Sequence, residues 1–167
     1  MKNLLFILVF FTFNFLNVNA QDNDKKEEAP VISIDDFQDK AHEFVGKKIY
    51  ITGMVDHVCK HGGKRLQLVG NKEDARLKIE AGDKINKFQK EIEGDDIKVY
   101  GTVKEKRIDE AYLSEWEEEV KDHHKPSDEE YKNDMKKIAN LRKQIKDSGK
   151  GYLSFYSMDA IKYEVIK

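Results

Sequence analysis

Residues 49–55 read IYITGMV, and the same pattern returns at residues 97–103 as IKVYGTV. In both segments β-branched residues occupy the first and third positions, glycine the fifth and valine the seventh. Alternating apolar positions are typical of a strand with one buried face. A glycine inside a strand often marks a bulge or a sharp bend. The two segments therefore predict two long strands, each bent at its central glycine, as a small closed barrel requires.

Two shorter strands and a helix are predicted between these segments. Residues 65–70 (RLQLVG) and 75–82 (ARLKIEAG) also alternate, and they indicate the strands. Residues 83–94 (DKINKFQKEIEG) indicate a helix, since Asp83 can cap its start and Gly94 can end it. The apolar residues of this helix share one face: Ile85, Phe88 and Ile92.

One helix is also predicted before the first strand, and a pair of helices is predicted before the last strand. Ser33 is a candidate N-cap for the first helix, which stops at Gly46. Residues 109–148 indicate a helical hairpin, and Ser127 forms a capping box with Glu130 at its second helix. Its two apolar stripes contain Tyr112, Leu113, Trp116, Val120, Tyr131, Met135, Ile138, Leu141 and Ile145. Because these stripes would form a large apolar patch if they were exposed, we expect the hairpin to pack on the barrel.

The final strand is indicated by residues 152–157 (YLSFYS) and 160–165 (AIKYEV). The order of strands and helices resembles the OB-fold, a five-stranded Greek-key barrel with a helix between its third and fourth strands. The predicted fold class is therefore α+β, with a single domain over residues 33–167. We expect an OB-fold-like Greek-key barrel with an N-terminal helix, a helix between strands three and four, and a helical hairpin inserted before strand five.

Residues 1–20 have the features of a secretory signal peptide. Lys2 precedes an apolar run over residues 4–16, and Ala20 ends a small-residue cleavage pattern. The run is too short to cross a bilayer, which needs about 20 apolar residues. Residues 21–32 follow as a predicted disordered leader. We therefore expect a secreted or periplasmic protein with no stable membrane insertion after signal cleavage.

The composition narrows the classes of partner. The chain intersperses 30 Lys and Arg with 32 Asp and Glu, so no global positive field attracts nucleic acid, which we do not expect as a partner. Cys59 is the only cysteine, so no internal disulfide holds the fold in an oxidising compartment. Its thiol is therefore buried, reactive or a ligand.

The stretch VDHVCKHGGKRLQLVG, residues 55–70, combines the thiol with two imidazoles. Gly62 and Gly63 predict a two-residue hairpin, because both central positions of a type I′ turn require positive φ. That register places three soft donors on the face that points toward the barrel interior or its mouth: His57, Cys59 and His61. It also places Lys64 at the rim of this face.

Imidazole and thiolate are ligands that zinc, copper and haem iron accept, so this face is a candidate metal or haem site. On a straight strand, however, His57 and His61 would stand about 13 Å apart, too far to share one ion. Either the tip of the hairpin curls and brings the two imidazoles together, or an adjacent pair of the three donors binds the ion with the help of ligands from other elements. Candidates for that help are Asp56, Asp83, His123 and His124. The alternative is a polar cluster around a buried, inert thiol.

The outer face of the second and third strands offers a different chemistry. Its outward positions include Arg65, Arg76 and Lys78 but no aromatic residue, so it fits an anionic glycan or peptide better than stacked bases. Tyr50 and Tyr100 also point outward, and we expect the helical hairpin to cover them.

Three segments resemble a group of small exported bacterial OB-fold proteins, most of them of uncharacterised function. They are GKKIYITGMVDHVCKHGGKRLQLVG, RIDEAYLSEWEEEV and LRKQI followed, after one residue, by DSGKGYLSFYS. The resemblance covers nearly all of the predicted mature chain. It implies the barrel fold and export, and it implies no activity, because OB barrels have many unrelated functions.

Together these patterns predict a non-catalytic binding module. Catalysis by a thiol needs a base within hydrogen-bond reach, whereas residues i and i+2 on a strand stand about 6.6 Å apart. The leading ligand is a transition metal ion, zinc or copper, or haem, held by His57, Cys59 and His61. The alternative is an envelope scaffold, with an envelope protein as partner, or a glycan-binding domain. The predicted ligand-binding cations are Lys64, Arg65, Arg76 and Lys78.

Overall fold

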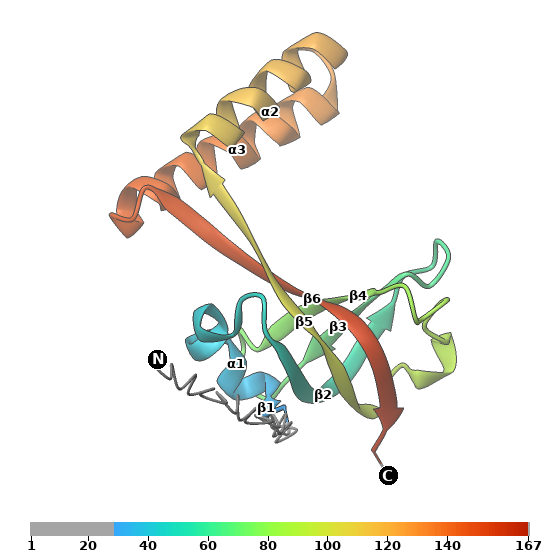
Figure 1. Cartoon of the computed structure of the whole chain (residues 1–167). Coiled ribbons are helices and arrows are strands. Elements are labelled where there is room, and N and C mark those ends of the chain that lie inside the picture. The colour runs from blue at the N-terminus through green and yellow to red at the C-terminus, as the bar shows by residue number, and fades with distance from the viewer. Residues whose placement is uncertain (1–28, 167) are drawn as a thin grey trace, which may run out of the picture.

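A computed structural model gives the structure of residues 29–166 (Figure 1). The predicted signal peptide and residues 21–28 of the predicted leader lie outside these described residues. The last two leader residues, Val31 and Ile32, belong to strand β1 (Val31–Ser33), which pairs in parallel with β2. No helix within residues 29–166 has the length and apolar character needed to cross a bilayer.

Five strands close into a barrel. They are β2 (Lys48–Val58), β3 (Arg65–Val69), β4 (Arg76–Ala81), β5 (Asp96–Asp109) and β6 (Tyr152–Val165). Hydrogen-bonded pairing runs β2-β3-β4-β6-β5 and returns from β5 to β2. The β4–β6 pair is parallel, and the other pairs around the barrel are antiparallel. The fold is therefore α+β with a closed, mixed five-stranded barrel, consistent with an OB-like barrel.

The barrel interior holds the alternating residues of the predicted strands. Ile49, Ile51 and Val99 are fully buried in one apolar cluster with residues of the other three strands. The pairing of β5 with β6 shifts register between Tyr100 and Gly101. Gly101, which the sequence pattern predicts to mark a bulge, therefore lies at such an irregularity.

One end of the barrel is covered by α1 (Ile34–Lys40) and the 3-10 turn η1 (Ala41–Phe44). The predicted cap is confirmed, since the Ser33 hydroxyl accepts a hydrogen bond from the Asp35 amide at 3.2 Å. The Asp35 carboxylate in turn accepts the backbone amides of Asn71 and Lys72 at 2.7 and 2.9 Å. These contacts tie α1 to the β3–β4 loop. The Lys72 amide bond, followed by the Asn71 bonds, lowers the pKa of Asp35 in spite of its partial desolvation.

The predicted helix over residues 83–94 is wrong. This segment contains only the 3-10 turn η2 (Lys90–Ile92). Two of its backbone amides donate hydrogen bonds to other segments instead. The Phe88 amide donates to the Gly63 carbonyl at 2.8 Å, and the Gly94 amide donates to the Val55 carbonyl at 2.8 Å. Phe88 is buried in the barrel core through this irregular path, so tertiary contacts override the helical pattern.

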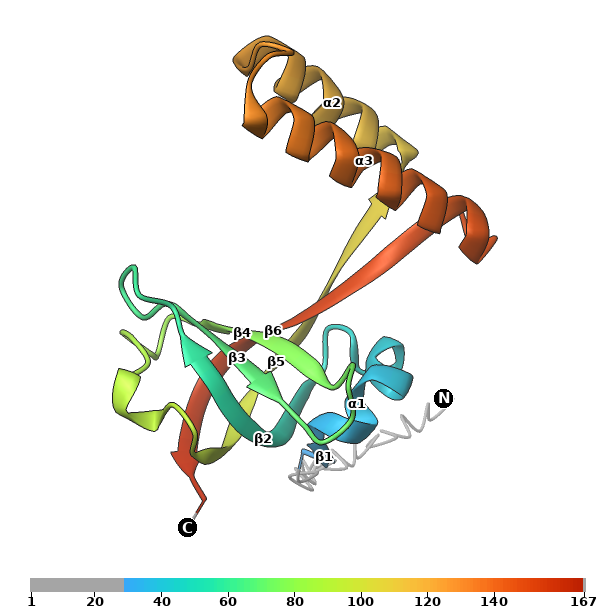
Figure 2. The ribbon, with the colours of Figure 1, turned by 180° about the vertical axis from the view of Figure 1, so that it is seen from behind.

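The helical hairpin is present, but it does not pack on the barrel. Helices α2 (Glu110–His123) and α3 (Glu129–Ser148) stand on the distal ends of β5 and β6, clear of the barrel in both views (Figures 1 and 2). Their apolar stripes face each other and the tip of the two-stranded ribbon, forming a second core. Its buried residues are Ile108, Leu113, Val120, Ile138 and Ile145. We call the ribbon tip with its two helices the arm.

The predicted capping box at the second helix is absent. Asp128 is the N-cap of α3, and no side chain makes a cap hydrogen bond there. Between the helices, Arg142 bridges Glu110 and Glu117 at 2.7 and 2.6 Å. Hydrogen bonds from Lys121 and then Arg142 lower the pKa of Glu117.

Candidate functional site

A bulge in β2 changes the direction of the predicted metal ligands. The β2–β3 pairing shifts register between Val55 and His57, so Val55 and Val58 are both buried. His57 pairs with Gln67 rather than Leu68, and its side chain is 62% exposed. The expectation that His57 points into the barrel is therefore wrong, because the extra residue of a bulge reverses the side-chain alternation that follows it.

The loop that follows is longer than the predicted two-residue turn. Residues 59–64 lie between β2 and β3, closed by a hydrogen bond from the Cys59 amide to the Arg65 carbonyl at 2.8 Å. A second bond runs from the Gly63 amide to the Cys59 carbonyl at 3.0 Å. Gly62 and Gly63 do adopt positive φ, 88° and 64°, as predicted. Cys59 is half-buried in this loop and His61 is exposed.

A groove of about 530 Å³ lies beside this loop, on the outer face of β3 and β4. It is lined by His57, Val58, Cys59, Lys60, His61, Arg65, Leu66, Gln67, Lys78, Lys90 and Glu93. We call it the hairpin groove. It brings the three predicted metal ligands together with two of the predicted ligand-binding cations, Arg65 and Lys78. The other two, Lys64 and Arg76, are exposed but do not line it.

Positive charge dominates the hairpin groove. Within residues 29–166, no carboxylate oxygen lies within 4.0 Å of the charged nitrogens of Lys60, Arg65 or Lys90. The Lys78 amino group pairs with Glu80 at 2.8 Å, but both side chains are more than 40% exposed, and such surface pairs contribute little. Glu93 is the one acidic residue of the lining, and it accepts the Val58 amide at 2.8 Å. The groove therefore presents several cations that are free to meet an anion.

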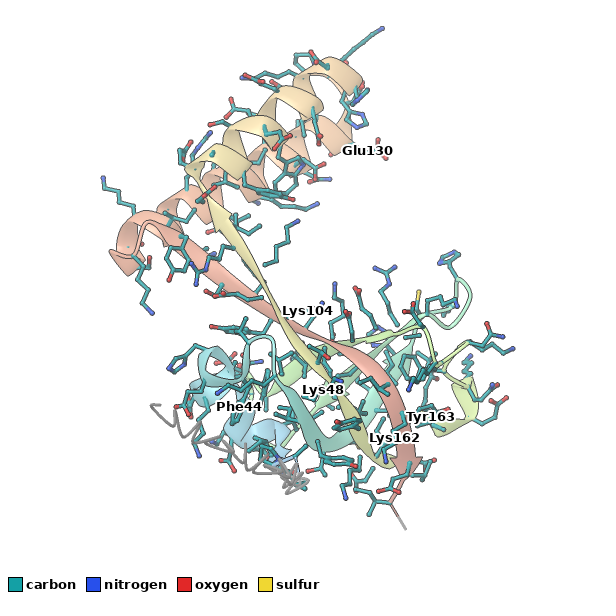
Figure 3. All side chains as sticks on the ribbon, viewed as in Figure 1. Phe44, Lys48, Lys104, Glu130, Lys162 and Tyr163 are labelled. Atoms are coloured by element: carbon teal, nitrogen blue, oxygen red, sulfur yellow. The ribbon has the colours of Figure 1, made fainter. Side chains whose placement is uncertain are left out.

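None of the additional metal-ligand candidates lines the hairpin groove. His124 lies 3.4 Å from Glu130, and Figure 3 places Glu130 at the far end of the arm. Asp56 bonds to the Nδ1 atom of His57 at 2.9 Å, whereas Asp83 is exposed in the loop after β4. His123, the neighbour of His124, ends α2 at the same distant joint. In the part of the chain that the structure describes, no three His, Cys, Asp or Glu side chains form a group that could hold a metal ion.

Tyr50 and Tyr100 are not covered by the hairpin helices as expected. They face each other across β2 and β5 with ring centroids 4.7 Å apart. The Lys98 amino group lies 4.7 Å from the Tyr50 ring centroid, and that of Lys162 lies 5.7 Å from the Tyr100 centroid. Lysine side chains thus cover these rings where helices were expected.

Sequence reasoning missed an exposed aromatic residue on the outer barrel surface. Phe155 is 48% exposed in β6, whereas its neighbour Tyr156 packs against the core and contacts Phe37 edge-on. Because side chains alternate along a strand, Phe155 shares the outward face of Ser157. The alternation of YLSFYS places Leu153 and Phe155 on one face, but it does not tell which face is exposed.

The comparisons with known proteins assign no family to the chain. No protein-family model matches it, and no curated protein matches it.

Proposed function

We propose that this chain is an exported, non-catalytic OB-fold module that binds an acidic saccharide in the hairpin groove. The Greek-key OB assignment is supported by the cyclic strand order with its one parallel pair, β4 with β6. In OB-folds the face of the second and third strands and the loop between the first two strands bind oligonucleotides and oligosaccharides. The corresponding parts here are β3, β4 and residues 59–64, and the groove lies on them.

The observation that carries this proposal is the set of cations around the groove. Arg65 offers a planar guanidinium that suits a carboxylate, and it has no carboxylate within 4.0 Å among the described residues. Lys78 lies on the neighbouring strand, and Gln67, opposite it, adds an amide that can bond to hydroxyl groups. Carboxylate and hydroxyl groups on one ring are the chemistry of a uronic acid.

The test is calorimetric titration with digalacturonic acid at low ionic strength, where exposed charge pairs are least screened. We expect the double variant Arg65→Gln/Lys78→Gln to lose affinity by about tenfold or more, since hydrogen bonds to charged groups contribute about 1.5–3 kcal/mol. The matched control is Lys136→Gln/Lys143→Gln on α3, which removes the same charge from exposed residues of the arm. It should keep the wild-type affinity within about twofold.

Two results would overturn the acidic-saccharide site. One is wild-type protein that does not bind digalacturonic acid, or that binds the neutral disaccharide cellobiose equally well. The other is an equal loss in both double variants, because that would assign binding to net charge rather than to the hairpin groove.

A metal or haem site at the same groove is the second candidate. The observation in its favour is that His57, Cys59 and His61 all line the groove. The loop would have to close around an ion, and a bound thiolate must first lose its proton. Affinity for the metal should therefore fall as pH decreases.

Cobalt titration of untagged protein tests this second candidate. Binding predicts a thiolate charge-transfer band that Cys59→Ala abolishes and His61→Ala weakens. Haem titration is run beside it, because the same side chains can be axial ligands. If neither cobalt nor haem binds the wild type better than Cys59→Ala, this candidate is wrong.

A further inference from the structure

We infer that the binding surface does not end at the hairpin groove but continues across β6 and β5 to the arm, so that the ligand is an acidic polysaccharide rather than a short saccharide. This inference rests on the proposed function. It assigns Lys104 and Phe155 to a second part of the site, which we call the arm subsite.

Strand pairing connects the two parts of the surface. Gln67 pairs with Lys78, Lys78 pairs with Ser157, and Ser157 pairs with Lys104. Residues paired across neighbouring strands share a face of the sheet. The inward neighbours along these strands, Ile79, Met158 and Val103, are fully buried, so the paired row faces outward. One polar row therefore leads from the groove lining to Lys104, which lies where the arm leaves the barrel (Figure 3).

Phe155 gives the arm subsite a flat apolar surface. It lies two residues before Ser157 on the same face of β6 and pairs with Lys106 of β5. The Lys106 amino group is held by the hydroxyl of Tyr112 in α2 at 2.8 Å. An exposed aromatic ring beside fixed positive charge suits a pyranose ring, whose C–H face can stack while its carboxylate meets the cation.

The spacing of these residues requires a ligand of several units. Neighbouring strands lie about 4.8 Å apart, so Lys78 and Lys104 are separated by about 10 Å across β6. Phe155 lies about 6.6 Å further along the strand direction than Ser157. The groove continues to Arg65, which pairs with Glu80, and Glu80 pairs with Asp159, four residues from Phe155. Arg65 and Phe155 are therefore separated by about 13 Å along the strands and about 10 Å across them. A ligand that contacts both must extend beyond two sugar rings.

The lack of aromatic residues on β3 and β4 favours a polysaccharide over a nucleic acid. Lys104 pairs with Asp159 at 3.3 Å and Lys78 with Glu80 at 2.8 Å, so carboxylates alternate with the cations. Both a nucleic-acid strand and an acidic polysaccharide would meet these carboxylates, so the choice between the two polymers depends on the aromatic residues of the surface. Non-specific single-strand binding also uses several aromatic platforms, whereas β3 and β4 carry none.

The experiment compares digalacturonic acid with hexagalacturonic acid on full-length mature protein by calorimetric titration. The variants are Phe155→Ala and Lys104→Gln. Their matched controls are Ile166→Ala, an exposed apolar residue directly after the C-terminal end of β6, and Lys143→Gln on α3. A thymidine hexadecamer is titrated under the same salt conditions to test the alternative polymer.

We expect the wild type to bind the hexamer at least tenfold more tightly than the dimer. Phe155→Ala and Lys104→Gln should each lose about threefold or more of hexamer affinity while dimer affinity stays unchanged, which also shows that the variants are folded. Both control variants should keep the full preference for the hexamer.

Three outcomes would overturn the inference. If the dimer binds and the hexamer binds no better, the proposed function stands and the arm subsite is wrong. If Phe155→Ala and Lys104→Gln leave the hexamer preference unchanged, the arm subsite is also wrong. If the thymidine polymer binds more tightly than the hexamer, the ligand class is wrong. Failure of the proposed function is distinct, because then neither saccharide binds.

Discussion

Gly101 lies where β5 and β6 change register and where the backbone of β6 leaves no room for a side chain. A Cβ atom at this position would lie 2.7 Å from the Met158 Cγ atom, and closer still to the Asp159 carbonyl oxygen. The backbone oxygen is held in the β-ladder, so it cannot move aside cheaply. The bulge predicted from the glycine pattern thus has a steric cause that the sequence alone does not reveal.

Gly101→Ala should destabilise the protein by about 1–3 kcal/mol, the usual cost of overpacking a core. Denaturant unfolding followed by circular dichroism measures this free energy. Thr102→Val, at the next and outward-facing position, is the control, and we expect it to stay within about 0.5 kcal/mol of wild type. An unchanged midpoint for Gly101→Ala would show that β6 can shift away, contrary to the close approach described.

Asp35→Ala should lower the unfolding midpoint at neutral pH, because it removes the acceptor of the Asn71 and Lys72 amides. The pKa of Asp35 is lower in the folded protein than in the unfolded chain. The stabilisation is therefore complete above the unfolded pKa and is lost as pH falls through the folded pKa. The difference between wild type and variant should be largest near neutral pH and should shrink below about pH 4.

Measuring both midpoints across this pH range checks the assignment. A difference that grew as the pH was lowered would contradict it, because the sign of the linkage would be reversed.

At the scale of elements, the sequence predicted the positions of the strands well and the register of β2 with β3 less well. Alternation is a local signal, and β2 to β6 all lie where it placed them. The bulge between Val55 and His57 depends on pairing with β3, which no local pattern reports. That one extra residue is why His57 faces solvent instead of the core.

The helix over residues 83–94 and the packing of the hairpin were predicted wrongly for the same kind of reason. Residues 83–94 have a helical pattern, but their amides bond to the β2–β3 loop and to Val55. The apolar stripes of α2 and α3 were predicted correctly, yet a stripe cannot say whether it faces the barrel or a partner helix. In the structure, the apolar stripes of α2 and α3 pack against each other.

Ile138→Ala should destabilise the arm while leaving the barrel intact. Ile138 is fully buried in the second core, and such truncations cost about 2–5 kcal/mol. We expect faster amide hydrogen exchange in α2 and α3, with β2 to β4 unchanged, because the two cores share no buried residue. Ile79→Ala in the barrel is the matched control and should raise exchange in the barrel strands. Equal acceleration everywhere after Ile138→Ala would show that the arm and barrel unfold together.

At the scale of the whole molecule, the proposed binding surface extends over the closed barrel, the loop of residues 59–64 and the arm. Two of the four predicted ligand-binding cations, Arg65 and Lys78, line the hairpin groove, whereas Lys64 and Arg76 do not. The sequence did not predict that the histidines and the cysteine would line the same groove, because the predicted register turned them inward. It also did not predict the exposure of Phe155.

The most direct test of the account is to map where an acidic saccharide binds. Two-dimensional NMR of ¹⁵N-labelled protein during titration with digalacturonic acid reports this residue by residue. We predict the largest amide shift changes at residues 59–63 and at Arg65, Gln67 and Lys78, with α2 and α3 unaffected. The account would be contradicted by changes centred on Tyr50 and Tyr100 or on the helices, or by the absence of any saturable change.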